Sequence, residues 1–81
     1  MQLKLTWRVK GRQDLDLLVF DEQQIAETMK ILIDRGVLDE EAEDNVKYVK
    51  SLRTNNQVNI LLTYKEAKIY SGDILEMLEE D

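Results

Sequence analysis

The sequence predicts an α+β fold in which a sheet of four to five strands packs on one helix. Three observations lead to this class. In two segments near the start of the chain, apolar and polar residues alternate, which is the pattern of strands with one buried face. Residues 21–35 instead place apolar side chains three or four positions apart, as in a helix that lies on a sheet. Turn residues separate further apolar runs in the second half of the chain.

The first two strands are expected to form a hairpin. From Leu3 to Val9 every second residue is apolar, and the same spacing continues from Leu15 to Val19 after a polar break that contains Gly11. Trp7 is in register with the apolar residues of its strand. We therefore interpret Trp7 as part of the core and not as a platform on which a ligand stacks.

A single helix is expected over residues 21–35. Asp21 can cap its start by accepting backbone N–H bonds, and Gly36 can end it as a left-handed C-terminal cap. The face toward the sheet consists of Ile25, Thr28, Met29, Leu32 and Ile33. The next segment, Asp39 to Asp44, has no apolar stripe, so we expect an exposed loop or a short turn. It also lacks the ligand spacing of a calcium-binding loop.

The second half of the chain is expected to supply the remaining strands. One strand lies within Val46 to Thr54, and Asn55-Asn56 forms a tight turn into a return strand from Gln57 to Leu61. Residues 64–69 show no clear period. After a turn at residues 71–73, the last strand runs from Ile74 to Leu78.

Composition excludes several classes of function. The 81 residues suffice for one hydrophobic core, so we expect residues 1–81 to form a single domain. Without cysteine or histidine, the chain has no disulfide, thiol nucleophile, imidazole base or typical zinc site. Asp14 and Asp16 are expected on a solvent face, where no environment would raise the pKa of either carboxyl for acid–base catalysis. We therefore expect a protein that is not an enzyme and has no cofactor.

Charge and hydropathy limit the classes of partner that the protein is expected to bind. A net charge of −6 repels the phosphates of nucleic acids and anionic membranes, so we expect a protein partner and no nucleic acid. No apolar run approaches the roughly 20 residues of a membrane span, and the opening residues do not resemble a signal peptide. We therefore expect a cytoplasmic protein that does not insert into membranes.

The end of the sequence carries a motif with a family resemblance. The motif is Ile69-x-x-Gly72-Asp73-x-Leu75-x-x-Leu78. It resembles the closing signature of ubiquitin-like domains, and especially of the YukD-like accessory proteins of bacterial type VII secretion loci. The resemblance implies a β-grasp fold, in which the first and last strands pair in parallel. It also implies a non-catalytic accessory role.

The residues of this motif have a physical interpretation of their own. Gly72 permits the positive φ of a tight turn, and Asp73 can accept local backbone N–H bonds. A phosphate or metal loop would need more glycines or more oxygen ligands. Leu75 and Met77 are expected to face the core. Glu79 to Asp81 stand where ubiquitin-type modifiers have two glycines, so we expect non-covalent binding instead of conjugation or sulfur transfer, and a solvated acidic end.

The candidate binding surface is the sheet face opposite the helix. The assumed strand registers place Leu18, Phe20 and Val49 there, bordered by Lys4, Arg8 and Lys47. Such a mixed apolar and basic surface suits an acidic, amphipathic protein partner. The alternatives are that a register slip or bulge buries some of these residues, or that they are scattered exposed apolar residues with no binding role.

The leading hypothesis is a non-catalytic protein-interaction module, plausible as a cytoplasmic accessory of a type VII secretion system. Two alternatives stay open: a β-grasp carrier or modifier-type protein, and a component of an unrelated phage or mobile-element complex. A mass shift of the intact protein in native lysate would identify a carrier. Neighbouring genes for a membrane ATPase would favour secretion.

Overall fold

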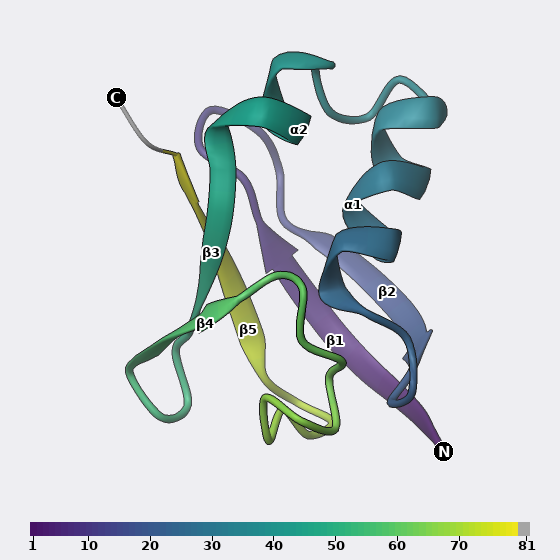
Figure 1. The fold of residues 1–81 in the computed structure, drawn as a ribbon, viewed down its shortest axis with the longest axis vertical. Helices are drawn as coiled ribbons and strands as arrows, with labels where there is room; N and C mark the ends of the chain where they lie inside the picture. Colours follow the sequence, from purple (N-terminus) through teal and green to yellow (C-terminus); the bar gives the residue numbers. More distant parts are fainter. Residues whose placement is uncertain (80–81) are drawn as a thin grey trace.

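The computed structural model describes residues 1–79 and confirms the predicted α+β architecture. In chain order the elements are β1 (Gln2–Arg8), β2 (Leu15–Phe20), α1 (Ile25–Asp34), α2 (Glu41–Asn45), β3 (Val46–Ser51), β4 (Asn56–Asn59) and β5 (Ile74–Glu79). The strands form one sheet in the order β2-β1-β5-β3-β4. Helix α1 lies on one face of this sheet, and α2 sits near one end of it (Figure 1).

The two strands from opposite ends of the chain pair at the centre of the sheet. Strands β1 and β5 are parallel, with Trp7 opposite Leu75. The other pairs, β1 with β2, β3 with β5 and β3 with β4, are antiparallel. The sheet is therefore mixed, and its first and last strands pair as the family resemblance implies.

The core lies between α1 and the inner face of the sheet. Trp7 and Leu75 are fully buried, as are Leu5 of β1 and Ile25 of α1. Met77 is also buried, so the predicted inward direction of Leu75 and Met77 is confirmed. The core position of Trp7 is confirmed as well.

The start of α1 differs from the expected one. The helix begins at Ile25, and its N-cap residue Gln24 makes no side-chain capping bond. The carbonyl oxygens of Leu62 and Ile60 instead accept hydrogen bonds from the backbone N–H groups of Ile25 and Ala26, at 3.0 and 2.8 Å. The expected cap, Asp21, pairs its carboxylate with the N-terminal amine at 3.1 Å. A distant loop therefore satisfies the free donors at the start of this helix.

Beyond α1, one expectation is confirmed and one is wrong. Gly36 has a φ of +75°, and the N–H of Val37 bonds the carbonyl of Leu32 at 2.9 Å, as in a left-handed helix cap. The acidic run was expected to be a loop or a turn. Residues Glu41–Asn45 form the short helix α2, because Ala42 is buried against the core and fixes this segment.

The predicted outward positions of Val49 and Lys47 are wrong. The register between β3 and β5 shifts between Val46 and Tyr48, so strict alternation is broken there. Val46 and Val49, three positions apart, are both 0% exposed. An irregularity of one residue moves the following side chains to the other face, which directs Val49 into the core.

The β3–β4 hairpin and the segment after it are more irregular than expected. Asn55 has a φ of 59°, and β4 ends at Asn59, so the return strand is shorter than the predicted one. In the following segment Thr63 and Glu66 bond each other reciprocally, each backbone N–H donating to the other's side-chain oxygen at 3.0 Å. This is a capping box, and its hydrogen bonds, led by the one from the backbone N–H of Thr63, lower the pKa of Glu66.

The closing motif forms the expected turn, and its aspartate is buried. Gly72 has a φ of +92°, and its N–H bonds the carbonyl of Lys4 at 2.8 Å. Asp73 is 1% exposed, and its carboxylate accepts bonds from the backbone N–H of Ile74 at 2.8 Å, the N–H of Arg53 at 3.2 Å and the hydroxyl of Ser51. The motif therefore ties β5 to the hairpin as well as to β1.

No helix within residues 1–79 has the length and apolar character needed to cross a membrane. In the same residues, no cluster of three or more potential metal-ligating side chains is present. The expected solvated end at residues 80–81 lies outside the described residues, whereas the backbone of Glu79 still belongs to β5 and pairs with Val46.

Candidate protein-binding edge

Two of the predicted contact residues are exposed together on β2. Leu18 is 68% exposed and Phe20 is 53% exposed, and both point away from the core face that holds Val19. In the antiparallel register Lys4 lies opposite Leu18. An exposed leucine and phenylalanine two positions apart on one strand form an apolar strip with a lysine beside it.

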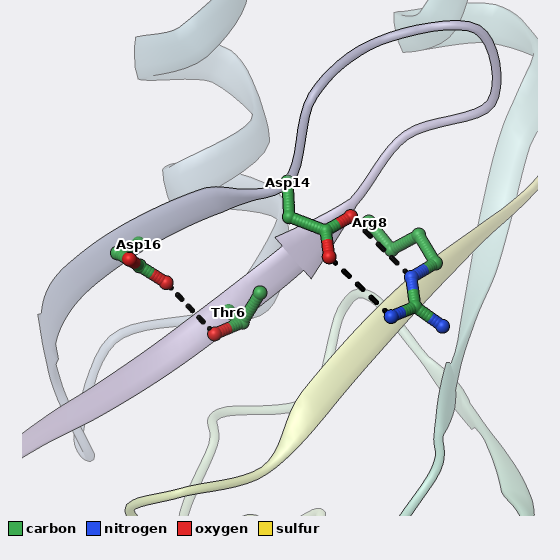
Figure 2. Close-up of polar contacts among 4 residues, drawn as sticks. All are labelled: Thr6, Arg8, Asp14 and Asp16. Atoms are coloured by element: carbon green, nitrogen blue, oxygen red, sulfur yellow. Dashed lines mark hydrogen bonds and ion pairs between the residues drawn. The ribbon is translucent and has the colours of Figure 1, made fainter.

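The centre of the outer sheet face is polar. Figure 2 shows Arg8 held by Asp14, with Nε and Nη2 each donating to one carboxylate oxygen at 3.3 Å. Beside them the hydroxyl of Thr6 donates to Asp16 at 2.9 Å. The hydrogen bond and the charge of Asp14 raise the pKa of the Arg8 guanidinium above its usual value. Arg8 is therefore engaged within the protein before any partner arrives.

The same row of charges continues across the sheet. Glu76 of β5 lies opposite Arg8 on one side and opposite Lys50 of β3 on the other. Together with Asp14, these side chains alternate in sign from β2 to β3. Alternating neighbours of opposite charge favour the folded sheet and leave this row with little net charge. The row separates Leu18 and Phe20 from the exposed Tyr48 on β3, so the outer face does not hold one continuous apolar patch.

The structure therefore redistributes the predicted contact residues. Leu18, Phe20 and Lys4 lie together on β2 and β1, and Arg8 belongs to the charged row. Val49 is buried. Lys47 lies beside α1 on the helix side of the sheet. Tyr48 was missed, because the assumed alternation directed it inward.

Strand β2 is an edge of the sheet, so part of its backbone has no neighbouring strand. The N–H of Asp21 bonds the carbonyl of Met1, so Met1 and Asp21 are a hydrogen-bonded pair of the β1–β2 ladder. In the same register, every second residue of β2 counted back from Asp21 exchanges hydrogen bonds with β1. Because antiparallel pairing alternates, the backbone groups of Asp16, Leu18 and Phe20 point outward. Those of Phe20 are already bonded to Gln23, its N–H to the side-chain oxygen and its carbonyl to the backbone N–H. The open stretch of the edge is therefore centred on Leu18.

A groove of about 340 Å³ runs along this edge, between β2 and α1. It is lined from the strand by Leu18, Val19 and Phe20, and from the helix by Ile31, Leu32 and Arg35. Ile31 is 45% exposed and lies outside the core-facing stripe of α1, a signal that the sequence contained and the prediction did not use. The groove joins apolar walls to a guanidinium and to the open backbone of β2.

The width of the sheet explains why a groove remains. Five strands about 4.8 Å apart span about 19 Å, whereas a helix with its side chains is about 10 Å across. One helix of ten residues therefore leaves an uncovered margin along each side of the inner face.

Beneath α1, a buried hydrogen bond joins Tyr64 to Thr28, which also lines this groove, and it has a structural role. The hydroxyl of Tyr64 donates to Thr28 at 2.6 Å beneath α1. Burial raises the pKa of Tyr64 to about 12. The indole N–H of Trp7 is close enough to favour the ionised phenol slightly, although no acceptor among residues 1–79 lies within hydrogen-bond geometry of it.

Comparison with known proteins supports the fold. No protein-family model matches the chain, and no curated protein does. Among solved structures, the chain is similar to a de novo designed protein based on ubiquitin, with a TM-score of 0.76 and 19% identity over 99% of this chain and 90% of that one. It is also similar to the C-terminal ubiquitin-like domain of mouse tubulin-specific chaperone E, with a TM-score of 0.71 and 15% identity over 99% and 88% of the two chains. The fold is therefore a ubiquitin-like β-grasp.

Proposed function

We propose that this protein is a non-catalytic interaction module that binds an extended segment of a partner protein along the open edge of β2. The observation that carries the proposal is the coincidence of an unpaired edge with an apolar groove. The edge offers the backbone N–H and carbonyl of Leu18, and the groove receives side chains between β2 and Ile31 of α1. Added strands obtain affinity from backbone bonds and specificity from pockets for alternate side chains.

The residues along the β2 edge and its groove determine which amino acids the partner segment should contain. Every second residue of an added strand faces the same side of the sheet, so the segment should alternate apolar and polar residues. Arg35 lines the groove on the helix side, and Lys4 lies next to Leu18 on the outer side. Acidic residues at the ends of the segment would therefore find cations on both sides.

For the cellular setting, we propose a cytoplasmic accessory of a bacterial type VII secretion machine. The support for this setting is the closing motif, from Ile69 through Gly72 and Asp73 to Leu78, and its likeness to the YukD-like proteins. The proposed mode of binding does not depend on it. Coexpression with the ATPase and membrane components of such a machine, followed by co-purification, would test this setting. If the Leu18→Pro variant no longer co-purifies with those components, the setting is linked to the β2 edge.

The edge itself can be tested by peptide selection. A displayed library of random twelve-residue peptides would be selected against wild type, Leu18→Pro and Leu18→Ala. Proline removes the outward N–H of Leu18 while the bonds to β1 stay in place, because they belong to the neighbouring residues. Alanine keeps that N–H and removes the apolar side chain. Folding of each variant is checked by circular dichroism.

We expect wild type to enrich peptides with alternating apolar residues, and Leu18→Pro to bind them at least about tenfold more weakly. Leu18→Ala should weaken binding by a smaller factor. Amide resonances of Asp16 and Leu18 should shift when the peptide is added. Equal affinity of wild type and folded Leu18→Pro, or shifts confined to the row of Arg8 and Glu76, would refute addition of a strand at β2.

A further inference from the structure

A second groove lies on the opposite side of α1, toward β3 and β4. It has a volume of about 290 Å³. Met29 and Ile33 of α1 form one wall, and Leu61, which follows β4, lies on the other. Leu61 is 65% exposed, so its apolar side chain is accessible to another molecule beside the groove. The loop that caps α1 passes here, so the backbone beneath the groove is held by the hydrogen bonds of Ile60.

Charge distinguishes this groove from the first. Lys30 of α1 and Lys47 of β3 line it, and Glu43 of α2 is the acidic side chain among its lining residues. Neither lysine takes part in an ion pair within residues 1–79. The irregularity in β3 that buries Val49 also brings Lys47 to this side of the sheet. Two ammonium groups therefore border an apolar groove in a protein whose net charge is −6.

We propose that this groove binds a short acidic, amphipathic peptide segment of a partner protein. A bulky apolar side chain of the segment occupies the space between Met29 and Leu61. Carboxylates on either side of that anchor contact Lys30 and Lys47.

The balance of charges favours a short segment over a large acidic surface. The groove is lined by two lysines and one glutamate, so it attracts acidic residues that lie directly above it. The net negative charge of the whole molecule, in contrast, repels an extended acidic surface at long range. A basic segment would instead place its charges next to Lys30 and Lys47. The site is independent of the β2 edge, because α1 lies between the two grooves.

The probe is the random twelve-residue peptide library, selected at low salt against wild type and against a variant with both Lys30→Glu and Lys47→Glu. Peptides enriched by wild type are then measured against Leu61→Asp, which changes an exposed side chain of the groove. Leu18→Pro is the matched control, because it changes the other groove. Circular dichroism checks folding, and Leu61→Ser replaces Leu61→Asp if the latter unfolds.

We expect wild type to enrich peptides in which acidic residues flank a bulky apolar residue. These peptides should bind Leu61→Asp and the double glutamate variant at least about tenfold more weakly, and Leu18→Pro equally well. The double variant should enrich lysine- or arginine-containing peptides, and binding to wild type should weaken as salt increases. Among peptides that bind Leu18→Pro as tightly as wild type, a neutral or basic consensus would overturn the proposal. The absence of any such peptides, or unchanged binding of them to both groove variants, would overturn it as well.

Discussion

Replacing Asp73 with alanine should lower the free energy of unfolding by about 3–5 kcal/mol. The carboxylate is 1% exposed and accepts from the backbone N–H groups of Ile74 and Arg53 and from the hydroxyl of Ser51. The hydroxyl can rotate, but the two N–H groups cannot. Each buried donor left without an acceptor costs about 1–3 kcal/mol, and bonds to a charged acceptor lie toward the upper part of that range.

This loss is large for a small domain. Total stabilities are about 5–15 kcal/mol, and for a chain of this length each kcal/mol lowers the melting temperature by about 4–8 °C. Asp73→Asn should cost less, about 1–3 kcal/mol, because the amide keeps one acceptor oxygen. Urea unfolding followed by the fluorescence of buried Trp7 measures both differences.

The matched control is Asp16→Ala. Like Asp73, Asp16 accepts a side-chain hydrogen bond, here from Thr6, but Asp16 is exposed. Asp16→Ala should therefore lower the free energy of unfolding by at most about 0.5 kcal/mol. If Asp73→Ala and Asp16→Ala cost the same, the carboxylate of Asp73 does not organise the junction between β5 and the β3–β4 hairpin.

Three other changes test the core and the turn. Leu32→Ala should cost about 2–5 kcal/mol, because it leaves a cavity under α1, and unchanged melting would place Leu32 at the surface. Gly72→Ala should cost at least about 1 kcal/mol. Apart from residue 72 and its two chain neighbours, no atom of the described residues lies within 4 Å of the added Cβ, so the cost is backbone strain at φ +92°, and a neutral result would contradict that conformation. Burial raises the pKa of Tyr64 from 10.0 to about 12, so wild type should lose stability as pH rises from 10 to 12, and Tyr64→Phe should lose less over that range. Parallel losses in the two proteins would place the Tyr64 hydroxyl in water.

The prediction for Gly72 rests on local chemistry, and the structure confirms its positive φ. The predictions for Gly36 and for the alternating residues of β1 are also confirmed. They depend on the backbone preference of one residue and on a two-residue period, which are both properties of the segment itself. The helix was also found from its period, although its start was placed too early. The capping box of Thr63 and Glu66 was equally readable in the sequence and was overlooked.

The candidate site was predicted only in part, because it depends on which strand is next to which. That Leu18 and Phe20 are exposed together follows from alternation along β2. That β2 is a free edge beside Ile31 follows from the strand order, which no local pattern encodes. The row from Asp14 through Arg8 to Glu76 likewise joins the residue before β2 to β1 and β5, and it exists only in the assembled sheet.

By itself, the sequence determined the class of fold, the positions of most strands, the core face of the helix and the left-handed turns, because each depends on residues close together in the chain. The tertiary structure decided the side on which Val49 and Lys47 lie, since one irregular residue in β3 reverses the faces that follow it. It also decided the burial of Asp73, which needs donors from Ser51 and Arg53 more than eighteen residues earlier. Both grooves exist because a single helix is too narrow for a five-stranded sheet, and that mismatch of widths appears only when the sheet is assembled.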